Sequence, residues 1–110
     1  MNQAERKRAI KDNYNKYHPP GGSNFQTLKR NAIFISAANS LKHEMKKLEI
    51  CYELKSIGIP FLTEAEKNKK KGDTIRRVDI VNLVTGEEIE IETNHKINKF
   101  KNKEGTTIYI

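Results

Sequence analysis

The chain has 110 residues, of which 35% are hydrophobic, so it has enough apolar material for one small domain but not for a large core. Its 21 Lys and Arg residues outnumber its 14 Asp and Glu residues and give a formal net charge of +7, which favours a polyanionic partner such as nucleic acid. The single cysteine, Cys51, excludes a disulfide framework and a zinc ribbon. Neither a long apolar run nor a secretory signal is visible, which predicts a cytoplasmic protein without a membrane partner.

Residues 1–24 are polar and basic, and we expect them to form a flexible N-terminal extension. They end in His-Pro-Pro-Gly-Gly-Ser-Asn, where the prolines and glycines stop regular structure. The basic residues before this point fit either a short helix or a disordered arm, and either a solvated tail or a DNA contact. The remaining residues, 25–110, are predicted to form the single domain.

Residues 25–58 are predicted to be helical, with the strongest pattern over 37–57. In this stretch apolar residues recur at intervals of four, three and four, a spacing that places them on one helix face: Leu41, Met45, Leu48 and Tyr52. We expect this face, together with Cys51, to pack on the core. Gly58 suits the C-terminal cap of the helix, and Pro60 prevents its continuation.

The pattern then changes to that of strands. Residues 59–65 and 74–84 are predicted strands separated by a charged loop, and 88–93 alternate strictly between Glu and Ile until Thr93. Residues 85–87 contain Gly86 and predict a tight turn, so the strands on either side should form a hairpin.

The C-terminal residues predict a last strand over 106–110. It follows a basic stretch, 94–105, that is either helical or irregular. This strand can pair in parallel with 88–93 only if 94–105 provides the crossover. The predicted order is therefore α-β-β-β-(α)-β, which defines a mixed α/β fold.

Carboxylates gather on the predicted hairpin. Glu88, Glu90 and Glu92 should share one strand face, and Asp79 joins them if Val78 and Ile80 face the core together with the isoleucines of 88–93. Such crowding raises carboxylate pKa values unless a cation intervenes, and hard cations such as Mg²⁺ prefer these oxygens. The alternative is a solvated acidic face offset by neighbouring Lys and Arg.

Glu44 is the second unusual carboxylate, because it lies inside the apolar arc of the predicted helix. A carboxylate there is costly unless it is paired or bound to a metal. It could simply pair with Lys47 or with an Arg of the sheet. The sequence His43-Glu44 also begins a zinc-protease motif, but Lys47 stands where the second His would be, so that chemistry is excluded.

These segments resemble the PD-(D/E)XK nuclease superfamily over about residues 40–110. The resemblance rests on the helix with Glu44, on "RRVDIV" with Asp79 and on "EEIEIET" with Glu90 and Glu92. It implies a restriction-endonuclease-like α-β-β-β-α-β core with a basic N-terminal extension. It also implies that Asp79 and Glu90 hold Mg²⁺ or Mn²⁺, with Glu44 and Glu92 in support. Glu92 occupies the position of the family's lysine, and Lys96 could substitute from beyond the strand.

The resemblance implies a metal-dependent deoxyribonuclease that cleaves duplex or branched DNA, in which Lys96 or His95 assists the reaction. A dimer is compatible with this function. The alternative is a basic, non-catalytic DNA-binding protein of the same fold. In either case the residues expected to contact DNA are Lys69, Lys70, Lys71, Arg76, Arg77 and His95.

Overall fold

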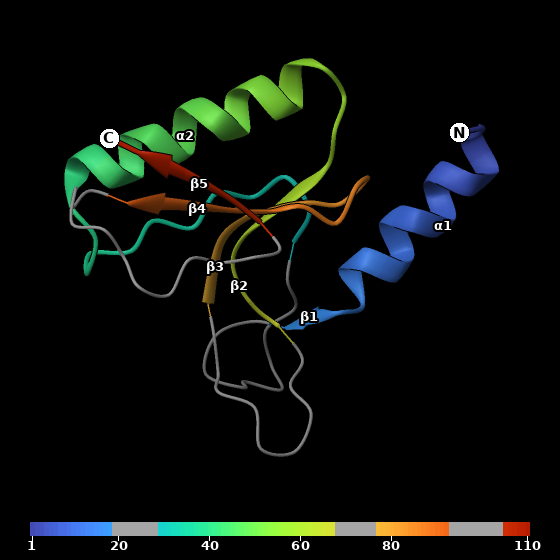
Figure 1. Cartoon of the computed structure of the whole chain (residues 1–110), viewed down its shortest axis with the longest axis horizontal. Helices are drawn as coiled ribbons and strands as arrows, with labels where there is room; N and C mark the ends of the chain where they lie inside the picture. Colours follow the sequence, from blue (N-terminus) through green and yellow to red (C-terminus); the bar gives the residue numbers. More distant parts are fainter. Residues whose placement is uncertain (19–28, 68–76, 93–104) are drawn as a thin grey trace.

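The computed structural model describes residues 1–18, 29–67, 77–92 and 105–110, and it shows a mixed α/β fold with a five-stranded sheet (Figure 1). The described elements in chain order are α1 (Gln3–Tyr14), β1 (Tyr17–His18), α2 (Leu41–Ser56), β2 (Phe61–Lys67), β3 (Arg77–Asn82), β4 (Glu88–Glu92) and β5 (Gly105–Tyr109). Neither of these two helices is both long and apolar enough to span a membrane.

The strands lie in the order in which they occur in the chain, β1-β2-β3-β4-β5. Neighbouring strands are antiparallel except β4 and β5, which are parallel, with Ile89 level with Thr106 and Ile91 level with Ile108. A parallel pair requires a crossover connection, and here the connection runs through 93–104, outside the described residues. The predicted hairpin is confirmed, and the last strand, whose pairing the sequence left open, is parallel to β4.

Apolar side chains cover both faces of the sheet. On one face α2 packs Ile50 and Cys51 against a cluster that includes Ile80, Ile89 and Ile91. The other face carries a second cluster, Tyr17, Leu62, Ala65, Val78, Val81 and Leu83, and two side chains of α1, Ile10 and Tyr14, pack against it. The apolar core is therefore divided into two small clusters, one on each face of the sheet.

Helix α2 is the element that the sequence predicted best. Ser40 caps its N-terminus, since its side chain accepts a hydrogen bond from the His43 amide at 3.1 Å. At its C-terminus Gly58 has φ +77°, and the Ile59 amide donates to the Leu54 carbonyl at 2.9 Å, the pattern of a Schellman motif. The helical prediction is wrong for 29–40, where the structure shows turns and irregular backbone.

The orientation of α2 differs from the prediction. Leu41, Met45, Leu48 and Tyr52, expected in the core, are 53–76% exposed. The buried side of the helix instead carries His43, Glu44, Lys47, Ile50 and Cys51. The apolar periodicity misled here because the ionic side chains on the buried side satisfy one another, so burying them is less costly than their polarity suggests. Cys51 is fully buried, as predicted.

The N-terminal residues contribute helix α1 and strand β1. Asn2 caps α1 by accepting a hydrogen bond from the Glu5 amide at 2.8 Å. Near the end of the helix the buried Asn13 donates to the Leu83 carbonyl at 2.8 Å, next to the turn between β3 and β4. The Tyr17 hydroxyl of β1 lies 2.7 Å from the Glu88 carboxylate. These contacts attach residues 3–18 to the sheet.

Alternation along the strands is interrupted at Glu64, which has φ +50°. Ile80 faces α2 as expected, but Val78 packs in the opposite cluster beside Ala65, its partner in β2. The left-handed backbone at Glu64 separates Thr63 from Ala65 and so moves their partners on β3 to different faces. The expectation that Val78 and Ile80 share one face is therefore wrong.

Candidate functional site

A buried ionic network joins α2 to the sheet, and Lys47 is its centre. The side chain of Lys47 is fully buried. Its ammonium lies 2.6 Å from Glu44 Oε2, 2.8 Å from Glu64 Oε1 and 2.7 Å from the Phe34 carbonyl. An ammonium has three donors, so these three acceptors saturate it. Burial alone would lower the pKa of Lys47, but the two carboxylates raise it, so the ammonium stays charged.

Glu44 is held by four donors as well as by burial. Its carboxylate accepts hydrogen bonds from Lys47, the Ser36 amide, Asn39 and His43. Burial raises the pKa of Glu44, but these donors outweigh burial and lower it from 4.5 to about 2. The pairing of Glu44 with Lys47, one of the alternatives left open by the sequence, is therefore present in the structure.

His43 connects the helix to Asp79 of β3. Its Nδ1 lies 2.8 Å from Glu44 Oε1, and its Nε2 lies 3.3 Å from Asp79 Oδ2. The same Asp79 oxygen accepts a hydrogen bond from the Ile91 amide of β4 at 2.8 Å. Asp79 therefore reaches toward α2. Its second oxygen, Oδ1, has no hydrogen-bond partner among the residues that the structure describes, although the side chain is only 13% exposed.

Three carboxylate residues occupy one level of the sheet. Glu64 falls between the pairs Thr63–Ile80 and Ala65–Val78, so it lies opposite Asp79 on the adjacent strand. On the other side of β3, Asp79 and Glu90 are the residues next to the pair Ile80–Ile89. Glu64, Asp79 and Glu90 thus stand on neighbouring strands, and all three carry carboxylate oxygens, the atoms that hard divalent cations prefer.

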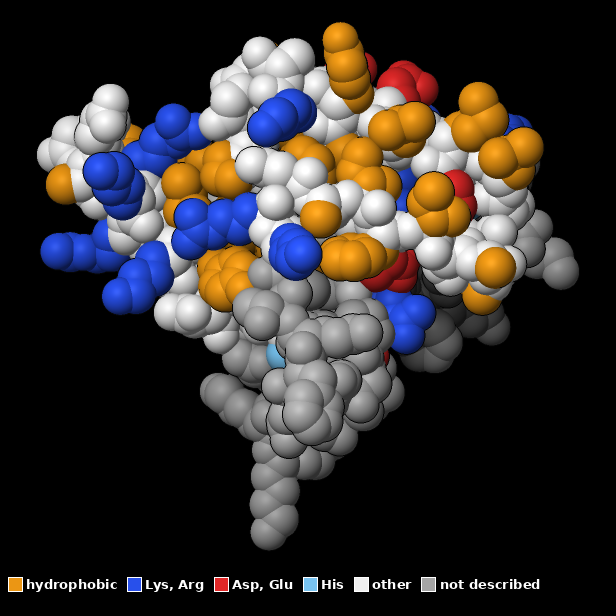
Figure 2. Space-filling view, turned by 180° about the vertical axis from the view of Figure 1, so that it is seen from behind, with side chains coloured by type: hydrophobic (Ala, Val, Ile, Leu, Met, Phe, Trp, Pro, Cys, Tyr) orange, Lys and Arg blue, Asp and Glu red, His pale blue; other side chains and the backbone are white. Residues whose placement is uncertain are grey.

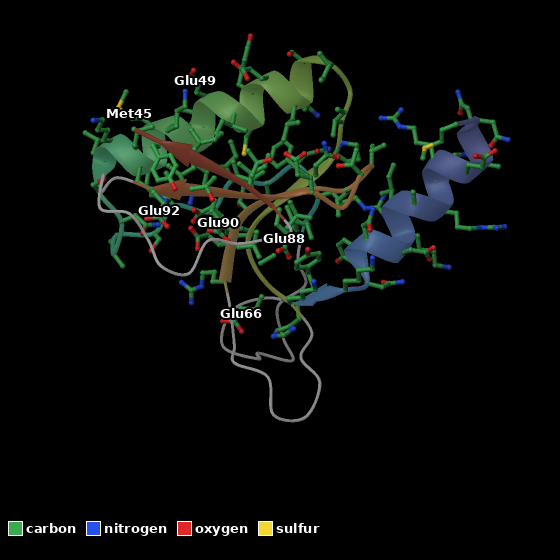
Figure 3. All side chains as sticks on the ribbon, viewed as in Figure 1. Met45, Glu49, Glu66, Glu88, Glu90 and Glu92 are labelled. Carbon is green, nitrogen blue, oxygen red and sulfur yellow. The ribbon has the colours of Figure 1, made fainter. Side chains whose placement is uncertain are left out.

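The remaining glutamates of β4 lie on the side of the strand away from α2. Figure 3 shows Glu88, Glu90 and Glu92 in a row along β4, while Ile89 and Ile91 are buried in the cluster under α2. The alternation predicted for this strand is confirmed. Glu88 is buried against Tyr17, whereas Glu90 and Glu92 are partly exposed.

The predicted site residues thus fall into two groups. Glu44 and Asp79 are joined through His43 on the α2 side, and Glu90 and Glu92 lie along the other side of β4. Arg77, predicted to contact DNA, is half exposed and lies 3.8 Å from Glu64 and from Glu66. The other predicted basic residues and the histidine lie outside the described residues: Lys69, Lys70, Lys71, Arg76, His95 and Lys96.

Sequence reasoning missed three members of the network: His43, Lys47 and Glu64 as a site residue. His43 and Lys47 were considered only as parts of a rejected zinc motif or as a neighbour of Glu44. Glu64 had the same signal that identified Glu44, a carboxylate inside an apolar stretch, Pro60-Phe-Leu-Thr-Glu-Ala. The structure confirms that Glu64 is buried, with only 6% of its surface exposed, as a carboxylate in an apolar segment suggests.

The donor chemistry of this region suits a hard divalent cation, because Asp79 offers an open oxygen and Glu64 and Glu90 flank it. In the described part of the chain, however, no three His, Cys, Asp or Glu side chains converge closely enough to hold a metal ion. Lys47 contributes to this arrangement, since it draws Glu44 and Glu64 toward its own ammonium. Glu90 points to the side of β4 away from α2, but Asp79 accepts a hydrogen bond from the Ile91 amide directly beside it, so Asp79 and Glu90 are the candidate ligands on these two strands.

Comparison of the chain with protein-family models, with curated proteins and with solved structures finds no match. A proposal for the function of this chain therefore rests on its residues and their geometry.

Proposed function

We propose that the protein is a metal-dependent DNA endonuclease with a restriction-endonuclease-like core. The observation that carries this proposal is the position of Asp79, held by His43 and the Ile91 amide with one oxygen open, at the same level of the sheet as Glu64 and Glu90. Carboxylates on adjacent central strands are the arrangement that the resemblance requires.

The fold supports the proposal at the level of topology. Helix α2 is followed by three antiparallel strands, β2 to β4, and a last strand, β5, that is parallel to β4. This matches the expected α-β-β-β-(α)-β order apart from the second helix, which would fall in 93–104, outside the described residues. Activity on a fold depends on its site residues, and the chemistry proposed here rests on them.

Each residue of the network has a role in this proposal. Asp79 and Glu90 would hold Mg²⁺ or Mn²⁺, with Glu64 and Glu92 nearby. The bound cation would activate a water and stabilise negative charge on the scissile phosphate. His43 orients Asp79 through the 3.3 Å contact at its Nε2. Lys47 and Glu44 are positioning residues, because their contacts fix α2 against β2 and β3.

DNA binding is assigned to the basic half of the molecule. In Figure 2, Lys and Arg side chains gather over the half that contains α1. The exposed basic residues of this segment are Arg6, Lys7, Arg8, Lys11 and Lys16. Together with Arg77 and the basic residues of 68–76, they provide positive charge for a phosphate backbone, which binds by charge rather than by sequence.

The test is cleavage of supercoiled plasmid in Mg²⁺, in Mn²⁺ and in EDTA. We expect nicking with metal and none with EDTA, and we expect Asp79→Asn to abolish nicking while DNA binding stays equal or becomes tighter, because a negative charge beside the phosphates is removed. Glu49→Gln is the matched control, since Glu49 is a 59% exposed carboxylate on the outer side of α2, outside both the network and α1, and it should cleave like the wild type.

A non-catalytic DNA-binding protein of the same fold is the second candidate. It is favoured by the saturation of Lys47 and Glu44 by their own neighbours and by Glu92 at the position where the resemblance expects lysine. This candidate predicts salt-dependent DNA binding without cleavage of linear, supercoiled or branched DNA in either metal. That combination of results would reject the endonuclease.

A further inference from the structure

The outer side of α2 carries a stripe of large apolar side chains that the fold leaves uncovered: Leu41, Met45, Leu48 and Tyr52. Each is 53–76% exposed. Figure 3 shows Met45, with Glu49, pointing away from the sheet, and Figure 2 shows apolar side chains gathered on the half of the molecule that carries α2. A contiguous group of this kind is typical of an interaction surface.

The stripe forms one wall of a surface groove. Ile110, which follows β5, lines the groove together with the side chains of α2. From Leu41 to Tyr52 the stripe spans eleven residue steps, or about 16 Å of helix. Its intervals of four, three and four residues are those by which one helix packs along a second helix. The spacing therefore favours a helix as the occupant of the groove.

The charges beside the stripe divide it into two halves. Lys42 and Lys46 belong to the N-terminal half, and Glu49 and Glu53 belong to the C-terminal half. At 100° per residue all four lie on the same flank of the helix. Lys46 already lies 3.2 Å from Glu49 within α2. Lys42 and Glu53 stand at the two ends, both exposed, and carry opposite charges.

This charge pattern is complementary to itself in reverse. When two copies of α2 pack antiparallel about a two-fold axis, the flank that carries these charges on one helix lies beside the same flank of the other helix, and the two run in opposite directions. Lys42 of each copy then faces Glu53 of the other. The midpoint of the apolar stripe lies between Met45 and Leu48, and the midpoint between Lys42 and Glu53 lies one residue further along. A single two-fold axis near this point therefore both overlaps the two stripes and aligns Lys42 of each copy with Glu53 of the other.

We propose that the protein forms a homodimer in which two α2 helices pack antiparallel along this stripe, with Lys42 and Glu53 pairing across the interface. A parallel arrangement would instead put Lys42 level with Lys42 and Glu53 level with Glu53. The antiparallel dimer covers the exposed stripe and matches opposite charges at both ends. It does not depend on the proposed nuclease function.

The first test is sedimentation of the chain between about 1 and 100 μM, a range that covers micromolar dissociation constants. We expect the mass to rise with concentration from 12.7 kDa toward twice that value. Met45→Glu and Leu48→Glu should keep the chain monomeric throughout. Ile57→Glu is the matched control, because Ile57 is also an apolar residue, 69% exposed, but lies beyond the stripe, and it should dimerise like the wild type.

The second test uses charge reversal and distinguishes the antiparallel homodimer from any other occupant of the groove. Lys42→Glu alone and Glu53→Lys alone each place like charges opposite one another at both ends, and each should weaken dimerisation ~10-fold or more. An equal mixture of the two variants restores opposite charges at both ends, so a heterodimer of near wild-type affinity should form. All of these positions are exposed, and thermal melting checks that the variants stay folded.

Three results would overturn the proposal. One is a wild-type chain that remains monomeric at the highest concentration, as expected if a lipid surface or another protein covers the stripe. Another is a dimer that Met45→Glu and Leu48→Glu do not affect. The last is a mixture of Lys42→Glu and Glu53→Lys chains that dimerises no better than either variant alone.

Discussion

Lys47 shows how a single residue can make a polar helix face compatible with a core. Its ammonium is completely buried, yet it contacts two carboxylates and a backbone carbonyl within 2.8 Å. A buried charge without partners would destabilise the fold by several kcal/mol, and removing one partner of a buried pair costs about 3–5 kcal/mol. The network of Lys47, Glu44 and Glu64 is therefore expected to behave as one unit.

This coupling is tested by removing the ammonium. Lys47→Met removes the ammonium that joins Glu44 and Glu64 and leaves Glu64, among the described residues, only the 3.8 Å contact with the half-exposed Arg77, so the free energy of unfolding should fall by about 3–5 kcal/mol. Glu64→Gln in the Lys47→Met background should return part of that loss. Urea unfolding of the two single variants and the double variant gives the coupling energy, expected at about 1–3 kcal/mol. Effects that simply add would show that the two residues act independently.

Glu44 should make stability depend on acid pH. Because its pKa is lowered from 4.5 to about 2 in the folded protein, its contribution is present above pH 4.5 and is lost as the pH falls toward 2. Its contribution therefore favours the folded state at neutral pH and disappears in acid.

Replacing Glu44 tests this contribution. Glu44→Gln should lower the free energy of unfolding at pH 7 by about 2–3 kcal/mol and flatten its dependence on pH between about 5 and 2. Glu49→Gln is the control, since Glu49 is 59% exposed and should change stability by no more than about 0.5 kcal/mol. An unchanged pH profile in Glu44→Gln would contradict the lowered pKa.

At the scale of elements, α1 is joined to the β3–β4 turn through Asn13. Asn13 donates to the Leu83 carbonyl and lies beside Gly86, which has φ +79°. A Cβ atom at Gly86 would lie 2.9 Å from Asn13 Oδ1, whereas a Cβ at Gly58, with φ +77°, would have no atom within 4 Å. The two glycines thus share a backbone conformation but differ in their surroundings.

This difference gives a matched pair of variants. Gly58→Ala should cost only the backbone strain, about 1 kcal/mol, and Gly86→Ala should cost about 1–2 kcal/mol more because Asn13 has to move. The measurement is thermal or urea unfolding of both. In an Asn13→Ala background the excess at Gly86 should disappear, and an excess that persists would place the clash elsewhere.

At the scale of the whole molecule, positive charge and the uncovered apolar stripe are concentrated in different places. Lys and Arg side chains gather over α1, while the uncovered apolar side chains gather on the half with α2 (Figure 2). With the proposed DNA contacts on α1 and the proposed dimer contacts on α2, the two interactions would not compete for the same surface. An antiparallel dimer would present two basic surfaces related by a two-fold axis, which suits a duplex or branched substrate.

Salt dependence measures the contribution of α1 to DNA binding. Replacing Lys7, Arg8 and Lys11 together with Gln should weaken binding to all sequences alike and reduce the slope of log K against log salt by about 0.9 for each phosphate that the variant no longer neutralises. Lys46→Gln is the control, since Lys46 lies in the N-terminal half of α2, the half away from α1, and pairs with Glu49 of its own helix, so the slope should stay unchanged. Binding of the triple variant that equals the wild type would exclude α1 from the DNA interface.

The sequence by itself determined the local elements of this protein. The periodicity within 37–57 and the cap residue Gly58, the alternation of 88–93 and the glycine at 86 predicted a helix, a strand and a hairpin, because backbone hydrogen bonding and turn geometry depend on nearby residues. Glu44 was also identified as a buried carboxylate from its neighbours alone. These properties are local in origin, and the structure agrees with them.

Only the tertiary structure decided which side of α2 faces the sheet and which side chains meet there. The helix buries His43, Glu44 and Lys47 and exposes its apolar stripe, the reverse of what hydrophobic periodicity predicts. The reason is that Lys47 meets Glu64, seventeen residues away, and His43 meets Asp79, thirty-six residues away. Such pairings compensate for the burial of charge, but they exist only once distant strands and the helix are assembled.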